Sequence, residues 1–274
     1  MSAFADEISS NLEASLDVLA ECGINTIELR AVDRVNVMDL SADQMEYIER
    51  VLNARSVSVG CIASPIGKAE ITGNFETELA RMEKALHLAK SLGSRYVRVF
   101  SYYLPKGEEP DKWRDKVLER IKILAREGEK AGVGVLLENE EGLYGDTVER
   151  CVDIVKAVGS SALRIVYDPC NLVIIGPRPF TDSYKTVRPH IEYLHVKDWS
   201  RDRKEMVPAG QGDAEWEPIL ADLVKTGYEG IIALEPHLSS AGQFSGFSGP
   251  DLFRSAYQSL SGLMKKTGMV VSTK

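Results

Sequence analysis

The sequence is poor in cysteine, and the few cysteines it has are widely spaced. Four occur among 274 residues, and no two of them form a CxxC pair. This argues against a disulfide framework or a cysteine-bound zinc site, so we predict free thiols and a cytoplasmic protein. Cys61 and Cys170 fall in apolar stretches typical of strands. The first ten residues lack a basic start followed by an apolar stretch, so we expect no secretory signal.

Long apolar runs and an excess of positive charge are also lacking. No stretch approaches the ~18 apolar residues of a membrane span. Lysine and arginine number 33 against 41 aspartates and glutamates, which gives a net charge of −8. A surface of this sign repels phosphate backbones, so neither a membrane nor nucleic acid is expected as a partner. No GxGxxG follows an apolar run and no GxxxxGK[ST] occurs, which disfavours a nucleotide-binding open sheet.

What the chain does contain is an alternation of short apolar runs and longer amphipathic stretches. Helices are predicted in the amphipathic stretches, with Asn11 and Ser41 as N-caps. After the sixth run, three prolines confine the predicted helix to about residues 181–187. The alternation predicts an α/β fold, a single (β/α)8 TIM barrel in which residues 1–274 form one domain. The predicted strands are residues 3–8, 26–30, 57–64, 96–100, 133–138, 163–168, 191–195 and 230–235.

Ionisable residues end the last four predicted strands, at Glu138, Asp168, His195 and Glu235. In a barrel the carboxyl ends of all strands meet at one rim, where active sites are built. Three carboxylates gathered there repel one another and are poorly hydrated, and a divalent cation removes both costs. Three carboxylates with one imidazole suit Mn²⁺ or Mg²⁺, with Co²⁺ and Zn²⁺ as alternatives.

A purely structural interpretation competes at each of these positions. A single carboxylate after a strand is commonly a helix N-cap or a surface ion pair, and a lone histidine is commonly a core residue with satisfied hydrogen bonds. The recurrence on four consecutive strands favours a shared site. This inference depends on the barrel.

Several segments at these strand ends resemble one family. They read LLENE at 136–140, YDPCN at 167–171, HVKD at 195–198 and LEPH at 234–237, with SPIGK at 64–68 and PAGQGDAEW at 208–216. Together they resemble the xylose isomerase-like TIM barrel superfamily, which contains sugar phosphate isomerases and epimerases. The resemblance implies that Glu138, Asp168, His195 and Glu235 hold one metal ion, Mn²⁺ first, in an enzyme of carbohydrate metabolism. It also implies acid/base roles for Glu138 and Glu235.

The resemblance thus implies a divalent-metal-dependent epimerase or isomerase of a keto-sugar or related polyol. Proton transfer would pass through a metal-stabilised enediolate. Two positions depart from the family pattern, because Asn171 and Glu140 stand where histidines are often found. Arg30 and Arg98, in the second and fourth strands, are candidates for neutralising a site carboxylate, for binding an anionic substrate group or for a structural ion pair. Predicted substrate-binding residues are Lys68, Asn171, Lys197, Trp199, Arg201 and His237.

Three other functions remain open. The nearest is a metal-dependent lyase or dehydratase of a keto-cyclitol or dehydroshikimate-type substrate on the same scaffold. An abasic-site endonuclease is disfavoured by the acidic charge and by the presence of only four histidines. A non-catalytic, polyol-binding barrel is disfavoured by the complete ligand set. The sequence is compatible with a homo-oligomer and does not determine the oligomeric state.

Overall fold

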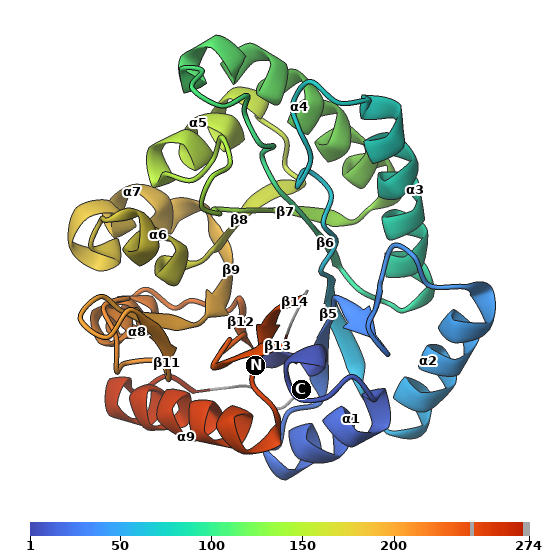
Figure 1. Ribbon diagram of the computed structural model, residues 1–274, viewed down its shortest axis with the longest axis vertical. Coiled ribbons are helices and arrows are strands. Elements are labelled where there is room, and N and C mark those ends of the chain that lie inside the picture. The colour runs from blue at the N-terminus through green and yellow to red at the C-terminus, as the bar shows by residue number, and fades with distance from the viewer. Residues whose placement is uncertain (242–243, 271–274) are drawn as a thin grey trace.

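Eight parallel strands close into a barrel at the centre of the computed structural model, which describes residues 1–241 and 244–270 (Figure 1). Around the barrel the order is β1, β2, β5, β6, β7, β8, β9 and β12, and β12 pairs with β1 to close it. Each predicted strand overlaps one of these eight, so the predicted (β/α)8 barrel is confirmed. Their bounds are β1 Ser2–Phe4, β2 Thr26–Leu29, β5 Ser58–Ile62, β6 Tyr96–Val99, β7 Gly134–Glu138, β8 Leu163–Tyr167, β9 Ile191–Val196 and β12 Ile231–Leu234.

Helices surround the barrel in Figure 1 and cover the outer face of its strands. Both predicted caps are present: the Asn11 side chain accepts a hydrogen bond from Ala14 N, and Ser41 forms a capping box with Gln44. Among the described residues no helix is long and apolar enough to cross a membrane. The helices are α1 Leu12–Glu21, α2 Ala42–Ala54, α3 Phe75–Ser91, α4 Arg114–Ala131, α5 Val148–Val158, α6 Pro169–Ile175, α7 Lys185–Val187, α8 Trp216–Lys225 and α9 Pro250–Thr267.

The segment after β8 differs from the prediction. A helix, α6, begins directly after the strand, and Cys170 lies in it rather than in a strand. Asp168 caps this helix and Pro169 occupies its first position, where the missing N–H costs nothing. The stretch predicted as one helix over residues 181–187 consists of a π-helical turn, Pro179–Tyr184, followed by α7. All four cysteines are free and buried, as predicted.

Short irregular elements follow several strands. The predicted first strand is shorter than expected, because Ala5–Glu7 form a 3₁₀ turn; two further 3₁₀ turns are Pro110–Trp113 and Arg188–His190. Three small antiparallel pairs project from the ends of barrel strands. They are β3 Ala31–Val32 with β4 Val35–Asn36, β10 Asp198–Ser200 with β11 Glu205–Val207, and β13 Ser239–Ala241 with β14 Phe244–Phe247.

The barrel interior is separate from the large core that packs the helices against the strands. Successive side chains of a strand face opposite sides, so alternate residues point inward. The interior contains a separate small cluster of buried side chains. It includes one residue from each of the last four barrel strands: Leu136, Val166, Tyr193 and Ala233. Two positions further along each strand stand Glu138, Asp168, His195 and Glu235. The same alternation therefore directs these four side chains inward, one layer nearer the carboxyl-terminal mouth.

Candidate metal centre

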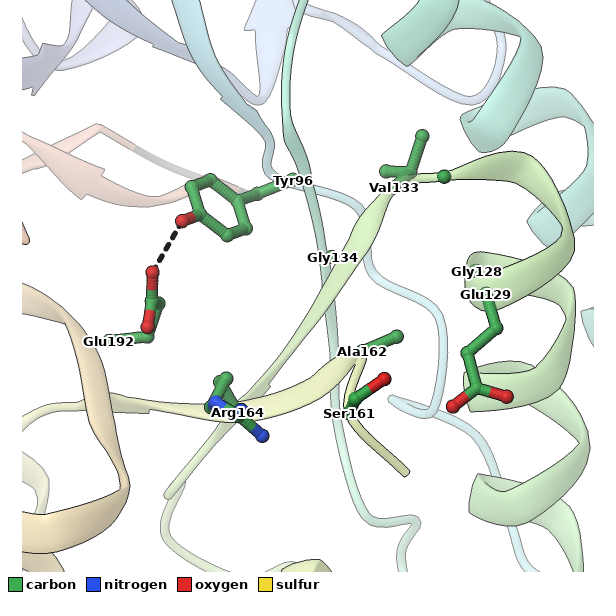
Figure 2. Close-up of a pocket in the computed structure, with 10 residues that line it drawn as sticks. Tyr96, Gly128, Glu129, Val133, Gly134, Ser161, Ala162, Arg164 and Glu192 are labelled. Atoms are coloured by element: carbon green, nitrogen blue, oxygen red, sulfur yellow. Dashed lines mark hydrogen bonds between the residues drawn. The ribbon is translucent and has the colours of Figure 1, made fainter. Parts of the chain in front are cut away.

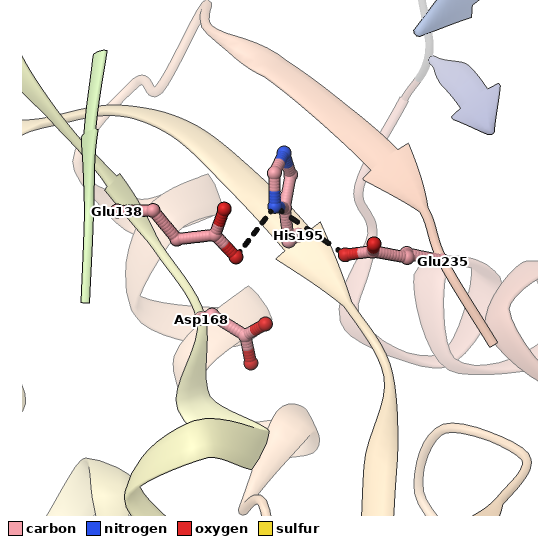
Figure 3. Close-up of side chains that lie close together, drawn as sticks. All are labelled: Glu138, Asp168, His195 and Glu235. Atoms are coloured by element: carbon pink, nitrogen blue, oxygen red, sulfur yellow. Dashed lines mark hydrogen bonds and ion pairs between the residues drawn. The ribbon is translucent and has the colours of Figure 1, made fainter. Parts of the chain in front are cut away.

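Four ionisable side chains converge at the carboxyl-terminal mouth of the barrel (Figure 3). Glu138, Asp168, His195 and Glu235 are all buried, and each offers a ligand atom within 4.8 Å of the others. His195 Nδ1 lies 3.1 Å from Glu138 Oε1 and 3.5 Å from Glu235 Oε2. The structure thus brings together all four residues for which the sequence predicts a shared site.

The spacing and the hydrogen bonding of this cluster both suit a divalent cation. Neighbouring ligand atoms around an octahedral ion at ~2.1 Å stand ~3 Å apart, close to the separations of the His195 nitrogen from its two glutamates. Three of the buried oxygens that accept no hydrogen bond of good geometry belong to this cluster: Glu138 Oε2, Asp168 Oδ2 and Glu235 Oε2. Arg98 lies beside the first and Lys197 beside the second, so the protein's own cations compensate part of the buried negative charge, and a divalent cation would compensate more of it. These residues could therefore hold a metal ion.

Arg98 supports Glu138 from the neighbouring strand β6. Its Nη1 lies 3.1 Å from Glu138 Oε2, and its other nitrogens donate to the carbonyls of Ala63 and Ser64. Burial by itself would raise the pKa of Glu138, but the charges of His195 and Arg98 outweigh it and lower that pKa to about 2. Glu138 is therefore a carboxylate at neutral pH, the form that binds a cation and accepts a proton.

Glu235 is held by a larger network made of Arg30, His237 and Glu7, and Glu7 was not predicted from the sequence. Arg30 Nη1 donates to Glu235 Oε1 at 2.8 Å, and His237 Nε2 lies 3.2 Å from the same oxygen. His237 Nε2 also lies 3.1 Å from Oε1 of Glu7, a fully buried carboxylate in the turn after β1. Burial disfavours a charged His237, but Glu7 and Glu235 outweigh this and raise the pKa of His237 to about 9. Because Arg30 and His237 both contact Oε1 of Glu235, its other oxygen, Oε2, is left to face the cluster, 3.5 Å from His195 Nδ1.

Asp168 caps a helix and also belongs to the cluster. Its Oδ1 accepts a hydrogen bond from Asn171 N and caps α6, as the structural interpretation expected, while its Oδ2 lies 2.7 Å from Lys197 Nζ. Burial raises the pKa of Asp168 to about 6, although the charge of Lys197 acts in the opposite direction. Burial would lower the pKa of Lys197, but Asp168, Glu235 and Glu140 raise it well above its usual range. Lys197 is therefore a buried ammonium group beside the cluster.

The remaining predicted substrate-binding residues differ in their surroundings. Lys68 and Asn171 both contact Glu140 at the mouth, with Lys68 Nζ 2.8 Å from its Oε1 and Asn171 Nδ2 3.4 Å from its Oε2. Trp199 is half-buried in β10. The guanidinium of Arg201 donates to the backbone carbonyls of residues 173, 176 and 177 at the end of α6. Substrate contact stays a prediction for all six residues of the predicted set.

A buried carboxylate organises the loop that follows β9. Asp198 accepts four backbone N–H groups, those of Trp199, Gly210, Gly212 and Ala214, at 2.8 to 3.1 Å. The glycine N–H groups of this loop thus bind the protein's own carboxylate and are not presented as a phosphate cradle. A side chain at Gly212 would lie 2.4 Å from Asp198 Oδ1, so the loop closes around this carboxylate.

A separate cavity of about 510 Å³ lies at the opposite, amino-terminal end of β6 to β9 (Figure 2). Gly134 and Arg164, at the starts of their strands, line it together with Tyr96, whose hydroxyl donates to Glu192. It contains none of the four clustered residues. In barrel enzymes this face is the one associated with stability rather than chemistry.

Comparison with known proteins identifies the family. A protein named probable L-ribulose-5-phosphate 3-epimerase from Mycoplasma pneumoniae is 24% identical over 227 residues, covering 80% of this chain and 71% of that protein. The 3-dehydroshikimate dehydratase of Bacillus anthracis is 22% identical over 226 residues, covering 75% and 79%. A solved structure of a D-tagatose 3-epimerase-like protein superposes with a TM-score of 0.76 at 19% identity, covering 97% of both chains. The family described as xylose isomerase-like TIM barrel matches residues 16–263. This chain belongs to that family.

Proposed function

We propose that this chain is a divalent-metal-dependent enzyme that epimerises or isomerises a keto-sugar or related polyol by moving a proton next to a carbonyl group. The observation that carries the proposal is the convergence of Glu138, Asp168, His195 and Glu235, all buried and each with one ligand atom within 4.8 Å of the others. Relatives named as sugar 3-epimerases support it. We further propose that the enzyme acts as one domain in the cytoplasm.

The four clustered residues would hold the cation, with Mn²⁺ the first choice and Mg²⁺, Co²⁺ or Zn²⁺ as alternatives. The ion would supply Lewis-acid polarisation of the substrate carbonyl and stabilise the charge that develops on its oxygen. Arg98 and Arg30 form ion pairs with Glu138 and Glu235 and fix the positions of these two carboxylates.

Proton transfer falls to the two glutamates. They extend from β7 and β12, on either side of His195 in the barrel order, so they flank the substrate from two directions. One would take the proton from the carbon next to the carbonyl, and the other would return a proton to the opposite face for epimerisation. Polarisation of the carbonyl by the ion would acidify that carbon, and Glu138, as a carboxylate, can accept its proton.

Lys197 and Asn171 are the best-placed substrate-binding candidates. Lys197 is only 6% exposed, and its ammonium lies 3.8 Å from Glu235 Oε2, close to the proposed reacting carbons. Asn171 cannot act as an acid or base, but its amide oxygen can accept a hydrogen bond from a substrate hydroxyl. His237 and Lys68 complete the set at the mouth.

A lyase reaction is the second candidate, since the chain is also related to a 3-dehydroshikimate dehydratase. The same carboxylate could remove the proton next to the carbonyl, after which a hydroxyl group on the next carbon leaves as water. Expulsion of that group, rather than return of a proton, distinguishes the two reactions.

The test is NMR in D₂O with a panel of keto-sugars and keto-cyclitols, combined with elemental analysis of the purified protein. Solvent deuterium entering the substrate without loss of mass indicates epimerisation or isomerisation, and loss of water indicates dehydration. We expect Glu138→Gln to lose this exchange, while Glu149→Gln, which neutralises an exposed carboxylate on α5, retains it. Exchange retained by Glu138→Gln would contradict the acid/base role.

A further inference from the structure

A lysine–glutamate pair lies at the rim of the mouth, between the loops after β5 and β7. Lys68 Nζ is 2.8 Å from Glu140 Oε1 and 4.4 Å from the centre of the Phe100 ring. The two charged side chains are 30% and 20% exposed, so they are partly withdrawn from water but can be reached by a ligand. The position of Lys68 is thus fixed by a carboxylate and an aromatic face together.

Glu140 is also tied to the candidate metal centre. Its second oxygen is 3.4 Å from Asn171 Nδ2, and the same amide donates to the carbonyl of Asn139 at 2.9 Å. Asn171 is in turn bound through its backbone N–H to Asp168 Oδ1. Glu140 therefore stands between the rim lysine and the helix that begins at a clustered carboxylate.

The other cations of the mouth are engaged as well. Arg98 pairs with Glu138, Lys197 with Asp168, and Arg30 with Asp6, Glu7 and Glu235, while Arg201 binds backbone carbonyls. Of the charge pairs around the mouth, the one between Lys68 and Glu140 is the most exposed. An arriving phosphate or carboxylate would have to displace Glu140 to reach Lys68, and it would meet the repulsion of that carboxylate.

We propose that Glu140 is a specificity-determining residue: by neutralising Lys68 at the rim, it selects an uncharged keto-sugar or polyol over phosphate esters and carboxylates. Hydroxyl groups can accept from Lys68 and donate to Glu140 without separating the pair, whereas an anion must compete with the glutamate. This inference rests on the proposed function and specifies its substrate class.

The experiment compares an uncharged ketohexose with its terminal phosphate ester. Deuterium exchange gives kcat/KM for each, and calorimetry gives their affinities. For the wild-type protein we expect a preference of at least ~10-fold for the uncharged sugar, because one partly screened charge pair is worth about one power of ten. Glu140→Gln keeps the shape of the side chain but frees Lys68, and should reduce that preference by about five- to tenfold.

Two controls isolate the pair. Glu141→Gln removes the same charge from an exposed neighbour and should leave the preference unchanged. Adding Lys68→Met to Glu140→Gln should restore the discrimination against the ester, because the freed cation is then gone. Melting temperatures identify any variant that does not fold; if Glu140→Gln is one of them, Glu140→Ala, which also frees Lys68, carries the comparison.

The outcomes separate this inference from the function on which it rests. Exchange into the phosphate ester in preference to the sugar, or a preference unaffected by Glu140→Gln, would overturn the role of Glu140 and leave the epimerase proposal intact. Neither exchange nor binding with any keto-sugar would overturn both.

Discussion

The four hydrogen bonds to Asp198 predict that this single carboxylate holds the loop after β9 in place. Asp198 is completely buried, and its partners are the N–H groups of residues 199, 210, 212 and 214. The substitution that tests this is Asp198→Asn, which keeps the shape of the side chain. An amide oxygen can still accept from two of these groups, but the amide nitrogen would face the other two, which are donors themselves.

The expected loss follows from those two unmatched donors. A hydrogen bond to a charged group contributes about 1.5–3 kcal/mol, so losing two lowers the free energy of unfolding by about 3–6 kcal/mol. A chain of this size loses about 2–4 °C in Tm for each kcal/mol, so Tm should fall by roughly 6–24 °C. Urea unfolding followed by circular dichroism measures the first quantity, and calorimetry the second.

Asp213→Asn is the matched control in the same loop. Asp213 accepts a hydrogen bond from the backbone N–H of Arg201, and an amide oxygen can keep that bond, so the cost should stay below about 1 kcal/mol. If Asp198→Asn were no more destabilising than Asp213→Asn, the carboxylate would not organise the loop. Because β10 and this loop carry Trp199 and Arg201, we also expect Asp198→Asn to weaken substrate binding.

Three further predictions concern the metal centre and the rim. Mn²⁺ at about 100 times its Kd should raise the free energy of unfolding by about 2.7 kcal/mol and Tm by roughly 5–10 °C. An equal rise of Tm in Asp168→Asn would contradict the proposed ligand set. Burial raises the pKa of Asp168 to about 6, and Glu138 and Glu235 outweigh the opposite effect of burial and raise the pKa of His195, so protons should compete with the cation for both ligands. The affinity measured by calorimetry should fall by at least ~10-fold per pH unit as the pH drops below about 6, and a flat profile between about pH 5 and pH 7 would refute this. Gly67→Ala should cost more than ~3 kcal/mol in urea unfolding, because its φ is +87° and the new Cβ would lie 2.1 Å from the Phe100 carbonyl oxygen. Gly107→Ala, with φ +80° but open space around it, should cost only about 1 kcal/mol, and equal losses would show that the contact is unimportant.

The structure differs from the sequence prediction in the segment after β8, where an apolar pattern typical of a strand overlaps with the residues that begin a helix. The apolar residues after Asp168 are compatible with a continuing strand, yet they form α6 because Asp168 caps the helix and Pro169 begins it. The carboxylate that the sequence assigned to a metal site is therefore also a helix cap. Oδ1 forms the cap, while Oδ2 lies beside Lys197 and is the oxygen that the proposed metal role would use.

The sequence by itself determined the barrel and the convergence of the four clustered residues. Parallel strands share a direction and alternate their side chains, so a charged residue two positions beyond an inward apolar one must reach the mouth. Only the tertiary structure decided which cation meets which carboxylate: Arg98 with Glu138, Glu7 with His237, Lys68 with Glu140. Such pairs join residues tens to hundreds of positions apart, and their distances depend on strand register and loop paths. Periodicity along the chain carries no information about these.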